Sequence, residues 1–305
     1  MKKILCFRNS KLGDYLISLP AIELIKKKNK KCKIYYLTVQ SKFYKKLPKK
    51  FNNKIIVDKF IYFNNDLQSK LKLIKILKSQ NFSCIYYLQE KTNLYREIRD
   101  YFFFSLLGIS KKYGFFIKTI NYEKQSETLQ IAKRVKSTTS ISELNYISNI
   151  QSKIEKPIFN FKYISISIGG FSQPKIWKMN NWVILIKLIL NKFNYKILIT
   201  GTKEDIYNAR YLSLINPKRI LSLCGKNNID QLFNIIKFSK AHITNDNGSM
   251  HIATLTSQKT LCLFNNHDPK GKWYPANKNA IIYRPNLGVG DIKPQSVFYN
   301  LNKIL

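Results

Sequence analysis

Short apolar runs alternate with stretches of helical periodicity along the first part of the chain. Runs typical of strands cover residues 4–7, 33–39, 55–57 and 84–88, and residues 67–77 have the apolar spacing of a helix. Strands that alternate with helices in this way are typical of parallel sheets. The pattern predicts an α/β fold in which helices cover both faces of a parallel sheet.

The second half of the chain repeats this alternation more clearly. Ile229, Leu232, Phe233 and Ile236 are spaced as one apolar face of a helix, and Pro294 opens a closing helical stretch. The strand-like runs of this half cover residues 163–168, 196–200, 220–224, 241–244 and 259–264.

The length predicts two domains. At roughly 100–200 residues per domain, 305 residues are enough for two hydrophobic cores. A clean series of strands and helices starts just after Lys156 and Pro157. We therefore place the domain boundary after residue 157.

The net charge is the most unusual feature of the composition. The chain has 53 Lys and Arg against 17 Asp and Glu, which gives +36. Such a field favours polyanions and anionic membrane surfaces. A general bias toward Lys, Asn, Ile, Tyr and Phe explains the charge equally well. The lysine clusters at 26–31 and 45–50 are candidates for contact with acidic lipid or a phosphorylated acceptor.

Other features favour a cytoplasmic protein. No run approaches the roughly 18–20 apolar residues of a membrane span, and the first apolar run is too short for a signal peptide. The five cysteines form no Cys-x-x-Cys pair. This usage favours a reducing compartment and argues against a zinc site or a disulfide framework.

Three segments that leave predicted strands carry candidate chemistry. Residues 244–251 read Thr-Asn-Asp-Asn-Gly-Ser-Met-His and open a helix, whose N-terminus suits a diphosphate. A cap formed by Asp246 or Asn247 is the simpler explanation of this segment. Residues 169–177 contain Lys175, which is either a phosphate ligand or an ordinary surface lysine.

The third segment, residues 8–14, ends in Gly13 and Asp14 at the start of a helix. A carboxylate in this position suits a general base, although it also suits the positive end of the helix dipole. The sequence lacks Gly-x-Gly-x-x-Gly, a P-loop and Asp-x-Asp. Nicotinamide-dependent dehydrogenases, P-loop nucleotidases and metal-diphosphate transferases are therefore disfavoured.

The three segments occur in an order that resembles glycosyltransferase family 9, the ADP-heptose:lipopolysaccharide heptosyltransferases. Residues 11–22 resemble the N-terminal signature of the family, and residues 245–253 and 264–275 resemble its later signatures. Lys175 and Trp177 match its Lys-x-Trp element, and residues 223–226 are similar to its Leu-x-Gly-Lys/Thr.

This resemblance implies a GT-B fold, with two Rossmann-like domains whose parallel sheets face a central cleft. Residues 1–157 would form the N-terminal acceptor domain and residues 158–290 the C-terminal nucleotide-sugar domain. Residues 291–305 would form a helix that packs back on the N-terminal domain.

The resemblance also implies an inverting, metal-independent transfer of a sugar, with heptose from ADP-heptose as the expected donor. The acceptor would be a lipopolysaccharide core or a related lipid-linked or phosphorylated glycan. Asp14 would be the general base, and Lys175 would stabilise the leaving diphosphate. No cofactor or metal is expected, and the enzyme would be cytoplasmic and peripheral on the inner membrane.

The remaining candidate residues fall into two groups. Glu204 and Asp205 are alternatives for the ribose contact. The acceptor group is Ser10, Lys11 and Gly13, and the donor group is Gly169, Ser172, Glu204, Asp205, Asp246, Asn247, Gly248, Ser249, Met250 and His251.

Two other functions fit part of the sequence. An epimerase-like enzyme would use a nucleotide sugar without transfer. A basic nucleic-acid-binding protein would explain the charge, but no known nucleic-acid-binding motif is present and no nucleic-acid partner is expected.

Overall fold

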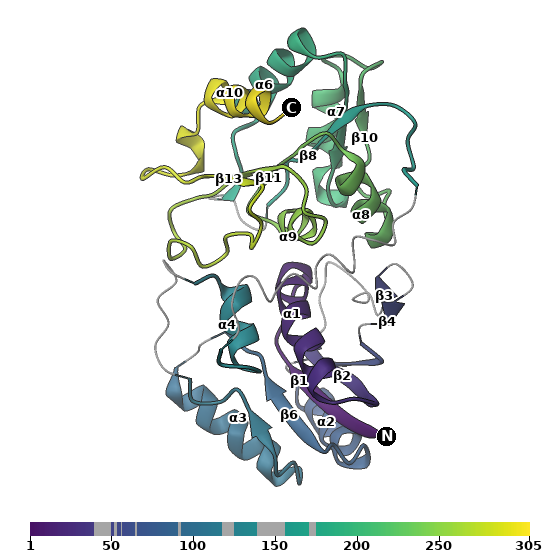
Figure 1. Ribbon diagram of the computed structural model, residues 1–305, viewed down its shortest axis with the longest axis vertical. Helices are drawn as coiled ribbons and strands as arrows, with labels where there is room; N and C mark the ends of the chain where they lie inside the picture. Colours follow the sequence, from purple (N-terminus) through teal and green to yellow (C-terminus); the bar gives the residue numbers. More distant parts are fainter. Residues whose placement is uncertain are drawn as a thin grey trace. The chain divides into compact units, whose positions relative to one another are not determined.

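The computed structural model describes residues 1–39, 50–51, 54–55, 57–64, 66–90, 93–117, 125–138, 156–170 and 175–305. The chain divides into two compact units, Met1–Tyr146 and Ile147–Leu305, which are coloured from purple to yellow along the sequence in Figure 1. The boundary predicted after residue 157 stays a prediction, because the residues just before it lie outside the described ranges.

Unit 1 is built on a five-stranded sheet in the order β5-β2-β1-β6-β7. All of its strand pairs are parallel. The strands are β1 (Lys2–Phe7), β2 (Cys32–Val39), β5 (Lys59–Phe63), β6 (Cys84–Tyr87) and β7 (Lys112–Tyr113). A separate antiparallel pair, β3 (Lys50–Phe51) and β4 (Lys54–Ile55), takes up part of the predicted strand at 55–57, and β5 enters the sheet in its place.

The helices of unit 1 cover both faces of this sheet. Leu73 and Leu77 of α2 share a core with Phe104 of α3 and with Leu5 and Phe7 of β1. Helices α1 and α4 contact each other and do not contribute to that core. The bounds are α1 (Leu12–Lys28), α2 (Leu67–Ser79), α3 (Leu94–Leu106) and α4 (Glu127–Lys133).

Unit 2 contains a six-stranded parallel sheet in the order β10-β9-β8-β11-β12-β13. From β8 the chain winds outward to β10, and it then returns to β11 and winds the other way. The carboxyl ends of β8 and β11 therefore flank the switch point where open α/β sheets bind ligands. The strands are β8 (Tyr163–Ser167), β9 (Lys196–Thr200), β10 (Ile220–Ser222), β11 (His242–Asn245), β12 (Thr260–Leu263) and β13 (Ala280–Tyr283).

Helices again cover both faces of the second sheet. One core holds residues of α6, α7 and α10, whereas Ile235 of α8 and Met250 of α9 belong to separate clusters. The helices are α6 (Met179–Lys192), η3 (Lys203–Asp205), α7 (Ile206–Ser213), α8 (Ile229–Phe238), α9 (Gly248–Leu255), η4 (Val289–Asp291) and α10 (Pro294–Ile304). These two layered units confirm the predicted α/β fold with two Rossmann-like domains.

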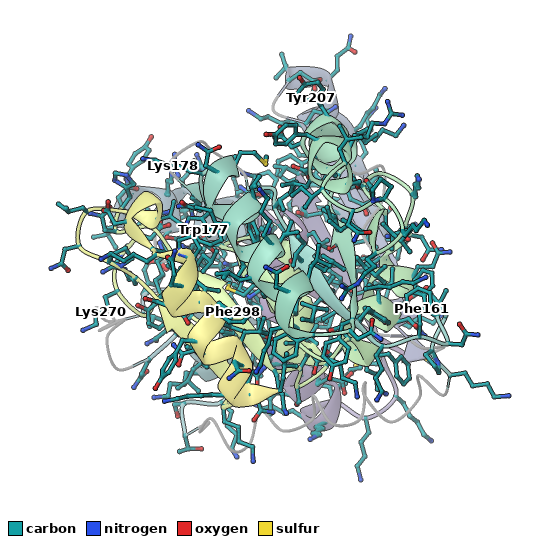
Figure 2. The ribbon with its side chains drawn as sticks, turned by 90° about the horizontal axis from the view of Figure 1, so that it is seen from above. Phe161, Trp177, Lys178, Tyr207, Lys270 and Phe298 are labelled. Atoms are coloured by element: carbon teal, nitrogen blue, oxygen red, sulfur yellow. The ribbon has the colours of Figure 1, made fainter. Side chains whose placement is uncertain are left out.

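The closing helix contributes to the core of unit 2. Val297 and Leu301 of α10 are fully buried there, and the packing of residues 291–305 on the N-terminal domain stays a prediction. The same core holds Trp177 and Trp182, whose rings meet edge to face at 5.0 Å. Figure 2 shows Phe298 of α10 on the same side of unit 2 as Trp177. Helix α10 buries its apolar face against α6.

None of the helices among the described residues is both long and apolar enough to span a membrane.

We expect Leu301→Ala to lower the free energy of unfolding by about 2–5 kcal/mol, because it removes a fully buried side chain and leaves a cavity. Urea denaturation would measure this change. Asn302→Ala, at an exposed position of the same helix, is the control and should change stability by less than about 0.5 kcal/mol. If Leu301→Ala left the free energy of unfolding unchanged, the packing of α10 would be contradicted.

Candidate active site

Two asparagines join the loops that leave β8 and β11. The Asn245 side-chain amide donates to the carbonyl of Ile168 at 2.6 Å, and that of Asn247 donates to the carbonyl of Gly169 at 2.8 Å. The Oδ1 atom of Asn247 also accepts from the backbone N–H of Ser249 at 2.9 Å and caps α9. Asn247 is therefore the cap of this helix, as the simpler explanation of the segment held, and it also fixes both loops at the switch point.

Lys175 lies between two carboxylates at this switch point. Its Nζ atom is 2.6 Å from Oδ2 of Asp246 and 2.7 Å from Oδ2 of Asp268. Burial alone would lower the pKa of Lys175, but the two carboxylates outweigh it and raise that pKa. Burial would likewise raise the pKa of Asp268, and Lys175 outweighs it and lowers that pKa. Lys175 is thus a charged cation in contact with two carboxylates.

Asp268 is a residue for which the sequence analysis proposed no role. It lies within the 264–275 segment that resembles the family, and nothing in its local pattern indicates a partner for Lys175. The guanidinium of Arg284 holds the loop in place by donating to the carbonyls of Asn266 at 3.0 Å and Asp268 at 2.7 Å.

Glu204 and Asp205 have different surroundings. Oδ2 of Asp205 accepts from the backbone N–H and the hydroxyl of Thr202, at 2.8 and 3.0 Å. A Cβ atom on Gly169 or Gly201 would lie 2.5 or 2.6 Å from the Asp205 carboxylate. The carboxylate of Asp205 therefore lies over the ends of β8 and β9, whereas Glu204 is exposed and a hydrogen bond with Thr202 lowers its pKa.

Two of the predicted donor residues are turned inward. The Met250 side chain is fully buried with Cys262 and Phe264, so it packs the core and cannot contact a ligand. The Ser249 hydroxyl is buried, donates to Oδ1 of Asn247 at 2.7 Å and lies 3.0 Å from Nε2 of His242. These side chains support the loop, so a donor contact by either residue would come from its backbone N–H, and that role stays a prediction.

The remaining donor candidates are placed as follows. Gly169 is the second residue after β8, Gly248 is the first residue of α9, and His251 lies in the first turn of that helix and is buried. Ser172 lies outside the described residues, as do the lysines at 45, 46 and 49.

Unit 1 presents a second charged cluster at the carboxyl end of its sheet. Arg8 follows β1 and is buried, and its Nη1 atom donates to the Leu88 carbonyl at 2.7 Å and to Oε1 of Glu127 at 3.1 Å. Its Nη2 atom is 3.4 Å from Oδ1 of Asp14. Burial would lower the pKa of Arg8, but Glu127 and Asp14 raise it overall. Neither Arg8 nor Glu127 was assigned a role from the sequence.

Asp14 lies in the first turn of α1 with its orientation fixed from two sides. Besides the ion pair with Arg8, its Oδ2 atom accepts from the backbone N–H of Lys11 at 3.1 Å. Of the acceptor candidates, Lys11 is exposed and Gly13 is partly exposed. The buried hydroxyl of Ser10 lies 2.6 Å from that of Tyr36, and its predicted contact with the acceptor stays a prediction.

Asp14 lines a pocket of about 570 Å³ within unit 1. The pocket is bounded by the segments after β1 and β6 and by the start of α3. Three arginines and three acidic residues, Asp14, Glu90 and Asp100, make its lining highly charged, and Asn9 and Gln89 add neutral polar groups. Its cationic and amide side chains are Arg8, Asn9, Gln89, Asn93, Arg96 and Arg99.

The described residues contain no group of three or more His, Cys, Asp or Glu that could hold a metal ion.

Comparisons with known proteins agree with this architecture. The family model for glycosyltransferase family 9 (heptosyltransferase) matches residues 101–297. The lipooligosaccharide heptosyltransferase 2 of Campylobacter jejuni is 25% identical, over 96% of each chain. Among solved structures, E. coli ADP-heptose LPS heptosyltransferase II has a TM-score of 0.70 at 18% identity and covers 100% of this chain and 98% of that one. E. coli heptosyltransferase WaaC with ADP has a TM-score of 0.75 at 13% identity, over 99% and 100%.

His242 makes the stability of unit 2 depend on pH. Its Nδ1 atom lies 2.8 Å from the Ser165 hydroxyl, and burial lowers its pKa from 6.5 to about 3. Below pH 6.5 the imidazole of His242 is protonated in the unfolded chain but stays neutral in the folded chain. We therefore expect this residue to cost about 2 kcal/mol of stability between pH 6.5 and pH 5.

Urea denaturation at both pH values measures this cost. His242→Gln should remove that part of the pH dependence, whereas His267→Gln, at an exposed position, should retain it. An unchanged pH dependence in His242→Gln would refute a neutral, buried His242.

Proposed function

The chain belongs to glycosyltransferase family 9, and from that premise we propose that it transfers a heptose from ADP-heptose to a lipopolysaccharide core acceptor. That it is a glycosyltransferase follows from the family. The names of its relatives support heptose and a lipooligosaccharide acceptor, and the ADP in one related structure supports the nucleotide.

The observation that carries the proposal is the arrangement around Asp14. This carboxylate borders a polar pocket and is oriented by a buried arginine and a backbone N–H. An acceptor hydroxyl in the pocket gives its proton to Asp14 while its oxygen forms a bond to the anomeric carbon. The bond from that carbon to the diphosphate oxygen breaks in the same step, so the configuration inverts.

The leaving diphosphate is stabilised by Lys175 and the N-terminus of α9. Lys175 already pairs with Asp246 and Asp268, and we propose that the diphosphate replaces one of them. Asp268 is 33% exposed and Asp246 only 7%, so we propose that Asp268 releases the lysine. These donors supply positive charge without a metal ion, and we expect transfer to continue in EDTA.

Asp205 is the better candidate for the nucleotide ribose. Its carboxylate lies over the carboxyl ends of β8 and β9, and only its Oδ2 atom is used by Thr202. Its other oxygen can accept from a ribose hydroxyl.

The acceptor is proposed to be lipid-linked or phosphorylated, and the reaction to take place at the cytoplasmic face of a membrane. Arg96, which lines the pocket that holds Asp14 and is exposed, can pair with a phosphate of such an acceptor. Family membership favours transfer over the epimerase and nucleic-acid-binding alternatives.

Asp14→Asn tests the mechanism. We expect the variant to fold, to bind ADP as the wild type does, and to lose roughly 10²–10⁴-fold in turnover, because the amide cannot take the proton. Steady-state kinetics and calorimetric ADP titration measure the two effects. Asp66→Asn is the matched control, since Asp66 caps α2 and asparagine caps helices equally well. Full turnover in Asp14→Asn would remove this residue from the mechanism.

A second pair of variants tests the ribose contact. Asp205→Asn should weaken ADP binding by roughly tenfold or more, because a charge-assisted hydrogen bond is lost. Glu204→Gln, one position away and exposed, should leave ADP affinity within about twofold of the wild type. The reverse order of the two affinities would assign the contact to Glu204.

A further inference from the structure

Helix α3 presents a row of apolar side chains to solvent. Tyr95, Ile98, Phe102 and Leu106 are spaced three or four residues apart and share one side of the helix, which we call the α3 apolar face. Phe102 is 62% exposed and Leu106 is 80% exposed. Single exposed apolar residues are ordinary, but a continuous row of large ones marks an interaction surface.

The helix is held firmly by its other side. Phe104 is buried beside Ile109 and Phe7, with its ring 5.4 Å from that of Phe7. The α3 apolar face is therefore the outer side of a helix whose inner side already fills the core of unit 1 (Figure 1). Nothing in unit 1 remains to cover it among the described residues.

Positive charge surrounds the α3 apolar face. Helix α2 packs on the same face of the sheet, contains no acidic residue and exposes Leu67, Leu71 and four lysines, Lys70, Lys72, Lys75 and Lys78. Arg96 and Arg99 lie on α3 itself and are exposed. Of the acidic residues of α3, Glu97 is buried and Asp100 pairs with Arg99 at 2.6 Å. That pair adds no net charge, so the positive charge beside the α3 apolar face comes from Arg96 and the lysines of α2.

We infer that the surface formed by α2 and α3 docks on an anionic lipid membrane. Exposed aromatic and aliphatic side chains beside lysines fit the interface between lipid headgroups and acyl chains. A nucleic acid would match the lysines but would gain little from Phe102 and Leu106. A second copy of the chain would bring together two molecules of net charge +36, which repel each other.

The position of this surface connects it to the acceptor. Arg96 and Arg99 line the pocket that holds Asp14, and they lie on the same helix as the α3 apolar face. Resting on the proposed function, docking through this face brings an acceptor anchored in the bilayer to the mouth of that pocket. The enzyme then collects its acceptor from the membrane surface instead of extracting it into water.

Vesicle co-sedimentation tests the inference with the full chain and no substrates. Wild type should pellet with vesicles of phosphatidylglycerol and phosphatidylcholine, and much less with phosphatidylcholine alone. The double variant Phe102→Ser and Leu106→Ser should bind the anionic vesicles about tenfold more weakly, because two inserted side chains are lost. Since both side chains are exposed, its thermal melting should match that of the wild type.

The control variant replaces two exposed apolar residues of unit 2 with serine. Tyr207 and Leu214 are 82% and 75% exposed on unit 2, where Figure 2 labels Tyr207. Tyr207→Ser with Leu214→Ser should bind anionic vesicles as the wild type does. Equal binding by the α3 variant and the wild type would overturn the inference. So would a wild-type dimer in sedimentation that the α3 variant abolishes, since a second copy would then cover this face.

Transfer assays separate this inference from the proposed function. With an acceptor stripped of its acyl chains, the α3 variant should turn over at the wild-type rate, and with vesicle-borne acceptor it should be slower. If the wild type binds vesicles through α3 but transfers no heptose to either acceptor, the docking surface stands and the proposed function fails.

Discussion

The ion pair between Lys175 and Asp246 is the contact on which the donor half of the account depends. It joins the segment after β8 to the loop after β11 with 2.6 Å between Nζ and Oδ2, across the switch point of the sheet. Asp268 contacts the same ammonium, so two carboxylates pair with one cation. A partly buried charge of this kind needs partners, and a diphosphate that takes the place of one carboxylate would keep the lysine paired throughout.

Unit 1 also pairs one cation with two carboxylates, and its cation is Arg8. Arg8 is buried at the end of β1 and is paired with Glu127 and Asp14, so the fold places one fixed cation beside the candidate base. Glu127 is fully buried and belongs to a helix far along the chain, whereas Asp14 borders the pocket. The arginine therefore has one structural partner and one partner that meets substrate. In each unit the ends of parallel strands gather the charges, and in each the cation has two carboxylates.

Local patterns predicted the alternation of strands and helices and the segments that leave β1, β8 and β11, and the resemblance to the family implied the two Rossmann-like domains. The local patterns failed where long-range packing decides. No local pattern shows that the apolar side of α10 joins the core of unit 2, or that the side chains of Ser10 and Met250 point inward. Asp268 and Glu127 lie far along the chain from their cations and follow no spacing rule, so only the folded chain shows these pairs.

The central claim is that the nucleotide half of the donor binds at the switch point of unit 2. Hydrogen–deuterium exchange with and without saturating ADP tests it most directly, since bound ligand suppresses the opening that exposes backbone amides. The account predicts slower exchange at residues 200–206 and 245–251, with no change at residues 8–14 and 87–100. Protection around Asp14 and Arg96, with none at residues 245–251, would contradict it.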